Sequence, residues 1–323
     1  MRVRDFAPAD YARLGEIVAA IEPERGRSPE WYRERDERWN PSLLRRRLVA
    51  EMNDGQVVGW GEVGHQWWSF HPSKFGMRLN VDPPFQRQGV GSALYAQLMQ
   101  QAEDEWHAQV LRCETRENRR HGVSFLEHRG FWQKNRRWEA RLVLDRAHMQ
   151  RFDEAQSRIA AQGIQVVSMA QAQQRQGELQ MVRGLFEMEQ RAAVDEPGYD
   201  PEGAMQFDQF VANELDEASR VDEGSFLAYL GQRLVGVSRL QRDLTQPLHL
   251  DVGFTGTDPQ YRGRGIALAL KLRTLAYARA HGFEQIQTQN DAVNVGMLHI
   301  NDELGFEREP AWLVYERTVA GVV

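Results

Sequence analysis

The same sequence pattern occurs twice in the chain, at Asp82–Leu94 (DPPFQRQGVGSAL) and at Asp258–Leu270 (DPQYRGRGIALAL), and the two copies align without a gap. A similar strand pattern precedes each copy, at Gly55–Gly59 and Gly231–Gly236, and a Gly-Phe pair follows each. A period this long indicates a duplicated domain, because the units of solenoid repeats span only about 20–50 residues. The chain is therefore predicted to contain two related domains.

The polar segment at residues 145–163, which ends in a glycine, marks the boundary between the two predicted domains. Its scattered apolar residues favour a short connecting helix over a flexible Gly/Ser linker. We therefore predict an N-terminal domain at residues 1–148, a connecting helix at 149–163 and a C-terminal domain at 164–323.

Helix and strand signals alternate in each half. Apolar residues recur at helical spacing from Tyr11 to Ile21, and strand-like patterns occur around Val57 and Val63 and at residues 77–81, 110–115 and 138–144. Such mixtures form layers in which helices pack on a sheet. The predicted fold class is α/β or α+β, with a twisted mixed β-sheet flanked by helices in each half.

Composition limits the kind of protein. The 323 residues, 41% of them hydrophobic, suffice for two medium-sized cores. No apolar run approaches the roughly 20 residues that a membrane span needs, and residues 1–8 lack the apolar segment of a signal peptide. We therefore expect a cytoplasmic protein that does not associate with membranes, either a monomer or a homodimer.

Cysteine and histidine usage gives no sign of a metal site. The single cysteine, Cys113, excludes an internal disulfide and a cysteine-rich zinc site. It lies in a strand-like segment, which favours a buried spectator over a nucleophile. The nine histidines show no metal-ligand spacing, so no metal is predicted.

The formal net charge of −6 is distributed unequally, with +3 on residues 1–150 and −9 on the remainder. A nucleic-acid-binding protein is expected to carry a strongly basic domain or stripe. Neither half has one, so nucleic acid is excluded as a partner.

Each copy of the duplicated pattern contains a glycine-rich loop. Gln86–Gly91 follows a predicted strand and leads into an apolar-periodic helix, and Arg262–Ala267 repeats this arrangement. Glycine allows backbone N–H groups to point into one concavity, and the dipole of the following helix adds to it, which suits a pyrophosphate. One such loop is most often a plain turn. Two copies in one chain favour anion binding.

These residues resemble the GNAT superfamily of acetyl-CoA-dependent N-acetyltransferases, whose pyrophosphate loop has the pattern Q/R-x-x-G-x-G/A. In that family the loop follows a strand that ends in a V-x-P-like turn, as Val81–Pro83 and Thr257–Pro259 do. The segment Thr288–Phe306, with Asn294 and a closing Gly-Phe pair, is similar to tandem GNAT proteins, the architecture that mycothiol synthases share.

The resemblance implies acetyl-CoA as the cofactor and assigns positions that bind it. The loop amides would bind the pyrophosphate, and the strand end before each loop would pair with the pantetheine arm. The implied positions are Thr255, Gly256, Thr257, Arg262, Gly263, Arg264, Gly265, Ile266, Ala267, Asn294 and Asn301 in the second half, and Leu79, Asn80, Val81, Gln86, Arg87, Gln88, Gly89, Val90 and Gly91 in the first.

The sequence departs from the family at the tyrosine that commonly protonates the leaving thiolate. Asn301 occupies that place in the second half and Leu126 occupies it in the first. No general acid is therefore identified. A thiol with a pKa of about 8.5 can leave as a thiolate near neutral pH with little proton help.

A general base is needed because an alkyl amine with a pKa of about 10.4 is mostly protonated at pH 7. Asp251, on the predicted strand Leu248–Phe254, lies where GNAT enzymes often carry an acid that acts through water. The alternative is a solvated or salt-bridged strand residue. Glu62 is the comparable candidate in the first half. Backbone N–H groups at Thr255–Thr257 would stabilise the charge on the thioester oxygen.

Two segments could form the acceptor side. The acidic stretch that runs from Asp195–Glu202 through Asp222 and Glu223 would attract a cationic amine, or it is simply a solvated face. A set of aromatic residues in the first half would wall an acceptor pocket, or they are packing residues: Trp31, Trp39, Trp60, Trp67, Trp68 and Phe70.

The predicted function is transfer of acetyl from acetyl-CoA to an amine of a small molecule or peptide, by direct attack in a ternary complex. The alternative is a non-catalytic acyl-CoA-binding or regulatory protein. The second half, with Arg262, Asn294 and Asp251, is expected to be catalytic. The first half, with Gln86 and Arg119 and without a strand acid, is expected to be structural or a weaker cofactor binder.

Overall fold

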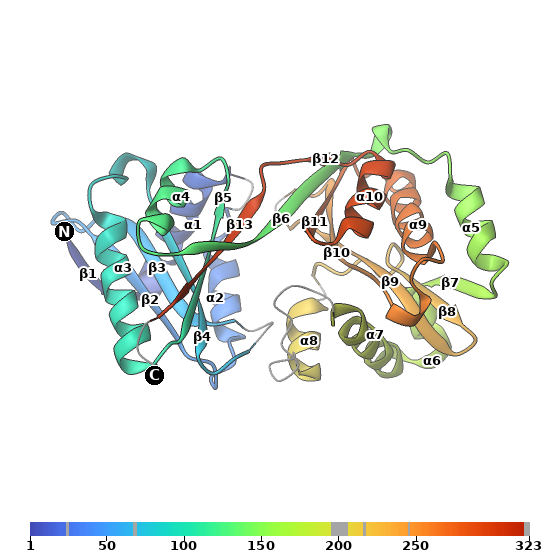
Figure 1. The fold of residues 1–323 in the computed structure, drawn as a ribbon, viewed down its shortest axis with the longest axis horizontal. Helices are drawn as coiled ribbons and strands as arrows, with labels where there is room; N and C mark the ends of the chain where they lie inside the picture. The colour runs from blue at the N-terminus through green and yellow to red at the C-terminus, as the bar shows by residue number, and fades with distance from the viewer. Residues whose placement is uncertain (24–25, 67–69, 195–205, 216–217, 245, 320–323) are drawn as a thin grey trace. The chain divides into compact units, whose positions relative to one another are not determined.

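The structure divides into two compact units, each with its own set of strands and helices (Figure 1). Unit 1 comprises Met1–Lys134 and Leu313–Val323, and unit 2 comprises Asn135–Trp312. The mixed strand-and-helix fold predicted for each half is confirmed. The computed structural model describes residues 1–23, 26–66, 70–194, 206–215, 218–244 and 246–319.

The sheet of unit 1 has the strand order β1-β2-β3-β4-β5-β13. Neighbouring strands from β1 to β4 are antiparallel, whereas β4 and β5 are parallel. The strand signals around Val57 and Val63 belong to one strand, β3. The bounds are β1 Arg2–Asp5, β2 Arg45–Glu51, β3 Val57–His65, β4 Lys74–Val81, β5 Val110–Arg116 and β13 Trp312–Thr318.

Helices cover both faces of this sheet. The predicted first helix is confirmed as α1, which packs Leu14 and Ile17 against β2 and β3 on one face. On the other face α3 packs Leu94 and Leu98 against the strands. The bounds are α1 Tyr11–Ile21, α2 Pro29–Glu37, α3 Val90–Gln100, continued by a π-helical turn at Gln101–Glu105, and α4 Arg120–Glu127.

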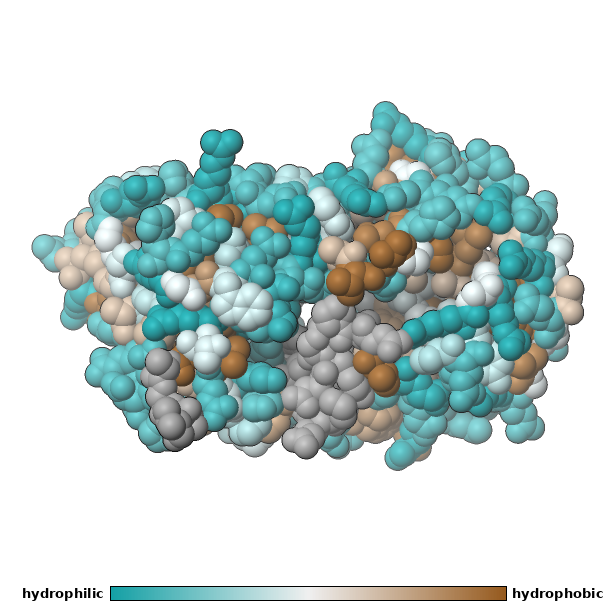
Figure 2. Space-filling model, viewed as in Figure 1, coloured by the Kyte–Doolittle hydropathy of each residue, from teal (hydrophilic) through white to brown (hydrophobic). Residues whose placement is uncertain are grey.

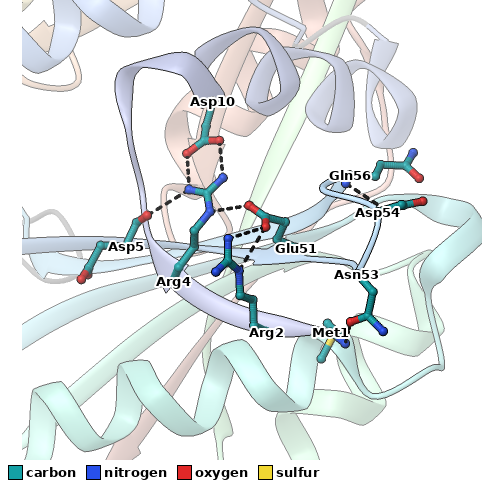
Figure 3. A network of polar contacts seen from close by, with 9 residues as sticks. All are labelled: Met1, Arg2, Arg4, Asp5, Asp10, Glu51, Asn53, Asp54 and Gln56. Carbon is teal, nitrogen blue, oxygen red and sulfur yellow. Dashed lines mark hydrogen bonds and ion pairs between the residues drawn. The ribbon is translucent and has the colours of Figure 1, made fainter.

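A polar network fixes the N-terminal strand at the edge of the sheet (Figure 3). Arg4 on β1 donates two hydrogen bonds of 2.8 Å to the carboxylate of Asp10, and its Nε donates to Glu51 on β2. Arg2 donates to the same Glu51 carboxylate at 2.7 Å. These contacts hold β1 in register beside β2.

The sheet of unit 2 has the strand order β7-β8-β9-β10-β11-β6, and β12 also pairs with β6. The pair β10 and β11 is parallel, and the other pairs are antiparallel. The bounds are β6 Trp132–Val143, β7 Ile164–Ser168, β8 Phe226–Leu230, β9 Arg233–Arg242, β10 His249–Thr257, β11 Gln285–Asp291 and β12 Glu307–Arg308.

Two groups of helices cover the two faces of this sheet. Helices α5, α9 and α10 share a core with Leu250 of β10 and Ile286 of β11. Helices α6, α7 and α8 share another core with Leu227 of β8 and Val237 of β9. The bounds are α5 Phe152–Ala160, α6 Met169–Gln176, α7 Glu178–Ala193, α8 Phe207–Glu214, α9 Ile266–Ala280 and α10 Val295–Leu304.

The two halves of the sequence exchange their final strands. Strand β6, which ends the first half, pairs with β11 in unit 2, and β13, which ends the second half, lies in the sheet of unit 1. The compact units therefore differ from the sequence halves 1–148 and 164–323, although α5 lies where a connecting helix was expected. A strand pattern shows that an edge needs a partner, not which segment supplies it.

We expect Tyr315→Ala to destabilise unit 1, although Tyr315 belongs to the second half of the sequence. Tyr315 is 1% exposed in the core of unit 1, and its hydroxyl donates to Glu127 at 3.1 Å. Truncating a buried aromatic side chain costs about 3–5 kcal/mol. Amide hydrogen exchange should accelerate in β2–β5, whereas Val295→Ala, at a 70% exposed position, should change nothing. Acceleration confined to unit 2 would contradict the strand exchange.

Candidate functional site

Both glycine-rich loops have the same backbone conformation. Arg87 and Gly89 have φ angles of 63° and 87°, and Gly263 and Gly265 have 74° and 85°. Alternating left-handed residues turn successive N–H groups toward one concavity, which suits an anion. Gly89 and Gly265 also cap α3 and α9, whose first N–H groups have no intrahelical partner.

A close contact between helix and sheet fixes the position of each loop. A Cβ atom added at Gly59 would lie 3.0 Å from Cγ1 of Val90, and one at Gly236 would lie 2.6 Å from Cγ2 of Ile266. Val90 and Ile266 are the first residues of α3 and α9. Glycine at these strand positions therefore lets each helix start, and the loop before it, pack directly against the sheet.

Each loop begins at a buried aspartate. Asp258 is 1% exposed, and its carboxylate accepts hydrogen bonds from Arg191 at 3.0 Å and Arg233 at 2.9 Å. Burial would raise the pKa of Asp258, but the hydrogen bonds from Arg233, a backbone N–H and Arg191 lower it below its usual value. In the first half, Asp82 pairs with Arg13. The sequence analysis missed these arginines, because an arginine on a helix or a strand matches no motif.

The first residue of each loop supports the strand end. Gln86 Nε2 donates to the carbonyl of Val81 at 2.9 Å, and Arg262 Nε donates to the carbonyl of Thr257 at 3.4 Å. Arg262 also donates to the carbonyl of Ala192 at 3.1 Å. The two side chains thus lie against equivalent strands, which leaves the loop amides to form the concavity.

Other loop side chains contact the turn before each loop, and one cation lies against the second loop. Gln88 donates to the carbonyl of Pro84 at 2.9 Å, and Arg264 lies over the Tyr261 ring. A Cβ at Gly265 would lie 3.6 Å from Nε of Arg158 on α5, whereas one at Gly89 would meet nothing within 4 Å. Arg158 therefore adds positive charge beside the second loop, which the sequence analysis did not find.

Each sheet opens next to its loop. Strands β10 and β11 pair only through His249–Asp251 and Gln285–Gln287, and β10 then continues to Thr257 with pairing to β9 alone. In unit 1, β4 and β5 pair only through Lys74–Gly76, and β4 continues to Val81. Within the described residues, one edge of each strand end therefore has no strand partner. The predicted positions 79–81 and 255–257 lie on these edges.

The open end of β10 carries a buried hydroxyl. Thr255 and Ser238 share a hydrogen bond of 2.9 Å between their hydroxyl oxygens. Thr257 is 8% exposed, and within the described residues its Oγ1 is buried without a hydrogen-bond partner. Buried polar atoms are normally satisfied, so Thr257 marks a place where a ligand atom would be accommodated.

Asp251 lies where β10 and β11 cease to pair, at the start of the opening between the two strands. It is the last β10 residue paired with β11, and a register irregularity follows between Val252 and Phe254. Leu250 points into the core under α9, so the half-buried Asp251 side chain lies on the opposite face, toward α6–α8. Gly76 occupies the same pairing position in the first sheet, which therefore has no acid there.

A buried lysine lies beside Asn301. Lys271 on α9 is 1% exposed, and its Nζ donates to Oδ1 of Asn301 at 2.6 Å. Asn301 Nδ2 in turn donates to Oδ1 of Asn290 on β11 at 2.6 Å. Burial lowers the pKa of Lys271 to about 7. The sequence analysis missed Lys271, although a lysine within an otherwise apolar stretch of helix is a usable signal.

Asn294 begins α10. Its Oδ1 accepts a hydrogen bond from the N–H of Met297 at 3.1 Å, so this oxygen serves as a helix cap, and the residue is exposed. Val293 and Val295 beside it are 64% and 70% exposed. Figure 2 shows hydrophobic surface gathered near α10 among mostly hydrophilic residues.

The first half lacks the chemical groups of the second. Leu126 is buried in the core of unit 1, and Tyr95 occupies the place on α3 that Lys271 occupies on α9. Glu62 forms an ion pair of 2.6 Å with Arg47, which also binds Asp36. Glu62 is therefore part of an ion-pair network.

The remaining predictions concern single residues and segments. Cys113 is buried, and burial raises the pKa of its thiol to about 12, as expected for a spectator. Trp60 is buried in a core with Leu14. Trp67, Trp68 and the acidic stretch 195–202 lie outside the described residues. Within the described part of the chain, every helix is too short or too polar to cross a membrane.

We expect Lys271→Met to be more stable than the native chain at pH 7. The ordinary pKa of lysine is 10.5, and that of folded Lys271 is about 7. Between these two pKa values the unfolded chain binds a proton at this lysine that the folded chain does not bind. The free energy of unfolding therefore rises with pH in this range, and the cost of burying Lys271 is fully present below about pH 7. Urea unfolding should show a gain at pH 7 that shrinks toward pH 10. Arg279→Met, at the exposed end of α9, should show no such pH-dependent gain. An equal effect of Lys271→Met at both pH values would contradict the lowered pKa of Lys271.

Comparisons with known proteins agree with this geometry. Over 67 residues the chain is 34% identical to a mycothiol acetyltransferase of Thermobispora bispora, a match that spans 21% of this chain and 23% of that relative. A GCN5-related N-acetyltransferase from Sphaerobacter thermophilus has a TM-score of 0.72 at 17% identity and covers 100% of this chain and 96% of its own.

A tandem GNAT protein from the clavulanic acid biosynthesis pathway has a TM-score of 0.75 at 18% identity, covering 100% of this chain and 99% of its own. The predicted tandem fold is thereby confirmed. A profile of the Acetyltransferase (GNAT) family matches residues 13–131 and 183–306. Because these matches cover most of the chain and include both loops, the protein belongs to the Acetyltransferase (GNAT) family.

Proposed function

We propose that this protein transfers an acetyl group from acetyl-CoA to an amine, and that the second half carries out the reaction. The observation that carries the proposal is the left-handed loop Gly263–Gly265 directly beside the open edge of β10. Family membership supports acetyl-CoA as the donor.

The residues of unit 2 fit such a donor. The loop amides and Arg158 offer donors and positive charge to a pyrophosphate. The open edge of β10 offers N–H and C=O groups to an amide-containing arm, and the unpartnered Oγ1 of Thr257 lies at its end. When bound, acetyl-CoA supplies a thioester whose carbonyl carbon an amine can attack.

Asp251 is proposed to accept the proton of the amine, directly or through water. It lies at the start of the opening, on the face opposite the loop helix α9. Backbone N–H groups at Thr255–Thr257 would stabilise negative charge on the thioester oxygen. Binding both reactants in one opening removes the entropic cost of their encounter, which supplies much of the acceleration.

The first half is proposed to support the fold or to bind acetyl-CoA weakly. Its loop has the same conformation, but Gly76 and Leu126 replace the two polar groups that flank the opening in unit 2. The acceptor is proposed to be an amine of a small molecule or peptide, with a cationic amine favoured by the charge of −9 on residues 151–323.

A non-catalytic acyl-CoA-binding protein is the second candidate. It is favoured by Leu126 and Asn301, which replace the tyrosine that usually protonates the leaving group in this family. Turnover distinguishes the two candidates, because both require acetyl-CoA binding.

We expect thiol release from acetyl-CoA with at least one member of a panel of aminoglycosides, polyamines, amino acids and peptides. Gly265→Asp should abolish this release, because the new carboxylate repels the pyrophosphate and blocks the loop amides. Gly89→Asp is the matched control, since φ is 87° there and 85° at Gly265. Release lost only in Gly89→Asp would assign catalysis to the first half, and acetyl-CoA binding without release for any amine would favour the second candidate.

We expect Asp251→Asn to reduce turnover far more at pH 7 than at pH 9. An amine with a pKa of about 10.4 has a larger deprotonated fraction at pH 9 and depends less on a base. The measurement is the pH profile of kcat/KM with the best amine of the panel. Equal losses at both pH values would show that Asp251 positions groups and does not accept a proton.

A further inference from the structure

Lys271 is a buried lysine that has no carboxylate partner among the described residues. It is 1% exposed, and among the described residues no carboxylate lies within ion-pairing distance of its Nζ. Its polar contact is Oδ1 of Asn301, and the Phe306 ring lies 5.0 Å from Nζ. Burying an ammonium group without a counter-ion is unfavourable, so a fold gains nothing from this arrangement by itself.

Asn301 connects Lys271 to the place where β10 and β11 no longer pair. Asn301 Nδ2 donates one hydrogen to Asn290, which lies on β11 beyond the last residue paired with β10, Gln287. Asn290 shares a strand face with Ile286, whose side chain packs under α9. Within the described part of the chain, the second hydrogen of Asn301 Nδ2 has no acceptor. Asn301 therefore lies on the α9 side of the opening, and Asp251 lies on the other side.

We propose that Lys271, acting through Asn301, stabilises the thiolate that leaves acetyl-CoA in the second half. This inference rests on the proposed function. Lys271 polarises the amide of Asn301 by donating to its Oδ1, which strengthens Nδ2–H as a donor toward sulfur. Lys271 is a positioning residue, because Asn301 is the group that would contact the sulfur.

The step balances without a proton from the lysine. The amine nitrogen forms a bond to the carbonyl carbon, the C–S bond breaks, and the sulfur leaves with the electron pair as a thiolate. The amine loses one proton to Asp251 or water. Solvent protonates the thiolate after release, so the net reaction converts an amine and acetyl-CoA to an amide and free CoA.

The charge of Lys271 depends on pH near neutrality, because burial lowers its pKa to about 7. Burial is the cause of this lowering, and several ionisable groups on neighbouring elements have partners of their own. Asp302 and Glu303 on α10 pair with Arg308 and Arg151, respectively. Arg239 and Arg233 on β9 pair with Glu189 and Asp258, Asp291 on β11 accepts from Asn135, and Arg273 on α9 donates to Gln156 on α5. The other ionisable groups on these elements are Tyr229 on β8, Arg242 on β9, His249 and Asp251 on β10, His299 on α10, Tyr277 and Arg279 on α9, and Asp153, Glu154 and Arg158 on α5.

The first half provides an internal comparison. Tyr95 occupies the α3 position that corresponds to Lys271, and its hydroxyl interacts with Arg317 on β13. Leu126 occupies the position of Asn301. The buried cation and its amide relay therefore occur only in the half whose strand carries an acid at the opening.

The decisive experiment is an ultraviolet titration of the thiol of coenzyme A bound to the whole protein. Near pH 6, where Lys271 is charged, the bound thiol should form more thiolate than free coenzyme A does, and Lys271→Met should lower this thiolate fraction about tenfold, as a rise of about one unit in the thiol pKa would. Asn301→Asp keeps a partner for Lys271 but replaces the amide donor with a negative charge, so it should also raise this pKa. Arg279→Met should leave it unchanged.

The pH profile of turnover separates this role from a structural one. The ratio of kcat/KM between the native chain and Lys271→Met should be about tenfold at pH 6 and about one at pH 9, because native Lys271 is then neutral. A thiol pKa that is equal in both proteins, or a ratio that does not vary with pH, overturns the inference and leaves the proposed function intact. Absence of coenzyme A binding to the native chain overturns both.

Discussion

The open edge of β10 is the constraint on which the rest of unit 2 depends. A strand that loses its neighbour after three residues leaves N–H and C=O groups without sheet partners, and such groups are costly when they are buried away from water. The strand end must therefore be held by other contacts. Pairing with β9, the hydrogen bond from Arg262 to the Thr257 carbonyl and the buried Asp258 with its two arginines provide them.

The two units use different residues for the same interactions. Gln86 and Arg262 bind equivalent strand carbonyls, and Arg87 adopts the left-handed conformation that Gly263 adopts in the second loop. An arginine from a covering helix reaches the buried aspartate in both units, although it lies near the start of α1 and near the end of α7. The interactions are thus repeated more faithfully than the residues that make them.

The sequence was sufficient for the duplication, the loop conformation and the mixed sheet, because glycine spacing and strand alternation are local properties. It was not sufficient for the exchange of β6 and β13, since any strand with the right alternation can complete a sheet edge. Lys271, Arg158 and Arg191 were missed for a related reason. Their roles come from contacts with residues distant in sequence, and of the three only Lys271, within an otherwise apolar stretch of helix, has a local signal.

The two halves differ in the free-energy cost of burying the side chains at equivalent positions. In unit 1, Tyr95 and Leu126 occupy these positions, and their side chains are compatible with burial. Unit 2 places a lysine and an asparagine there, and burial disfavours the charged form of the lysine strongly enough to lower its pKa to about 7. Destabilising groups of this kind concentrate at functional sites, where they serve the chemistry and not the fold. Unit 1 reaches the same fold without a buried lysine at this position. The chemistry at the opening, and not the fold, therefore accounts for Lys271 in unit 2.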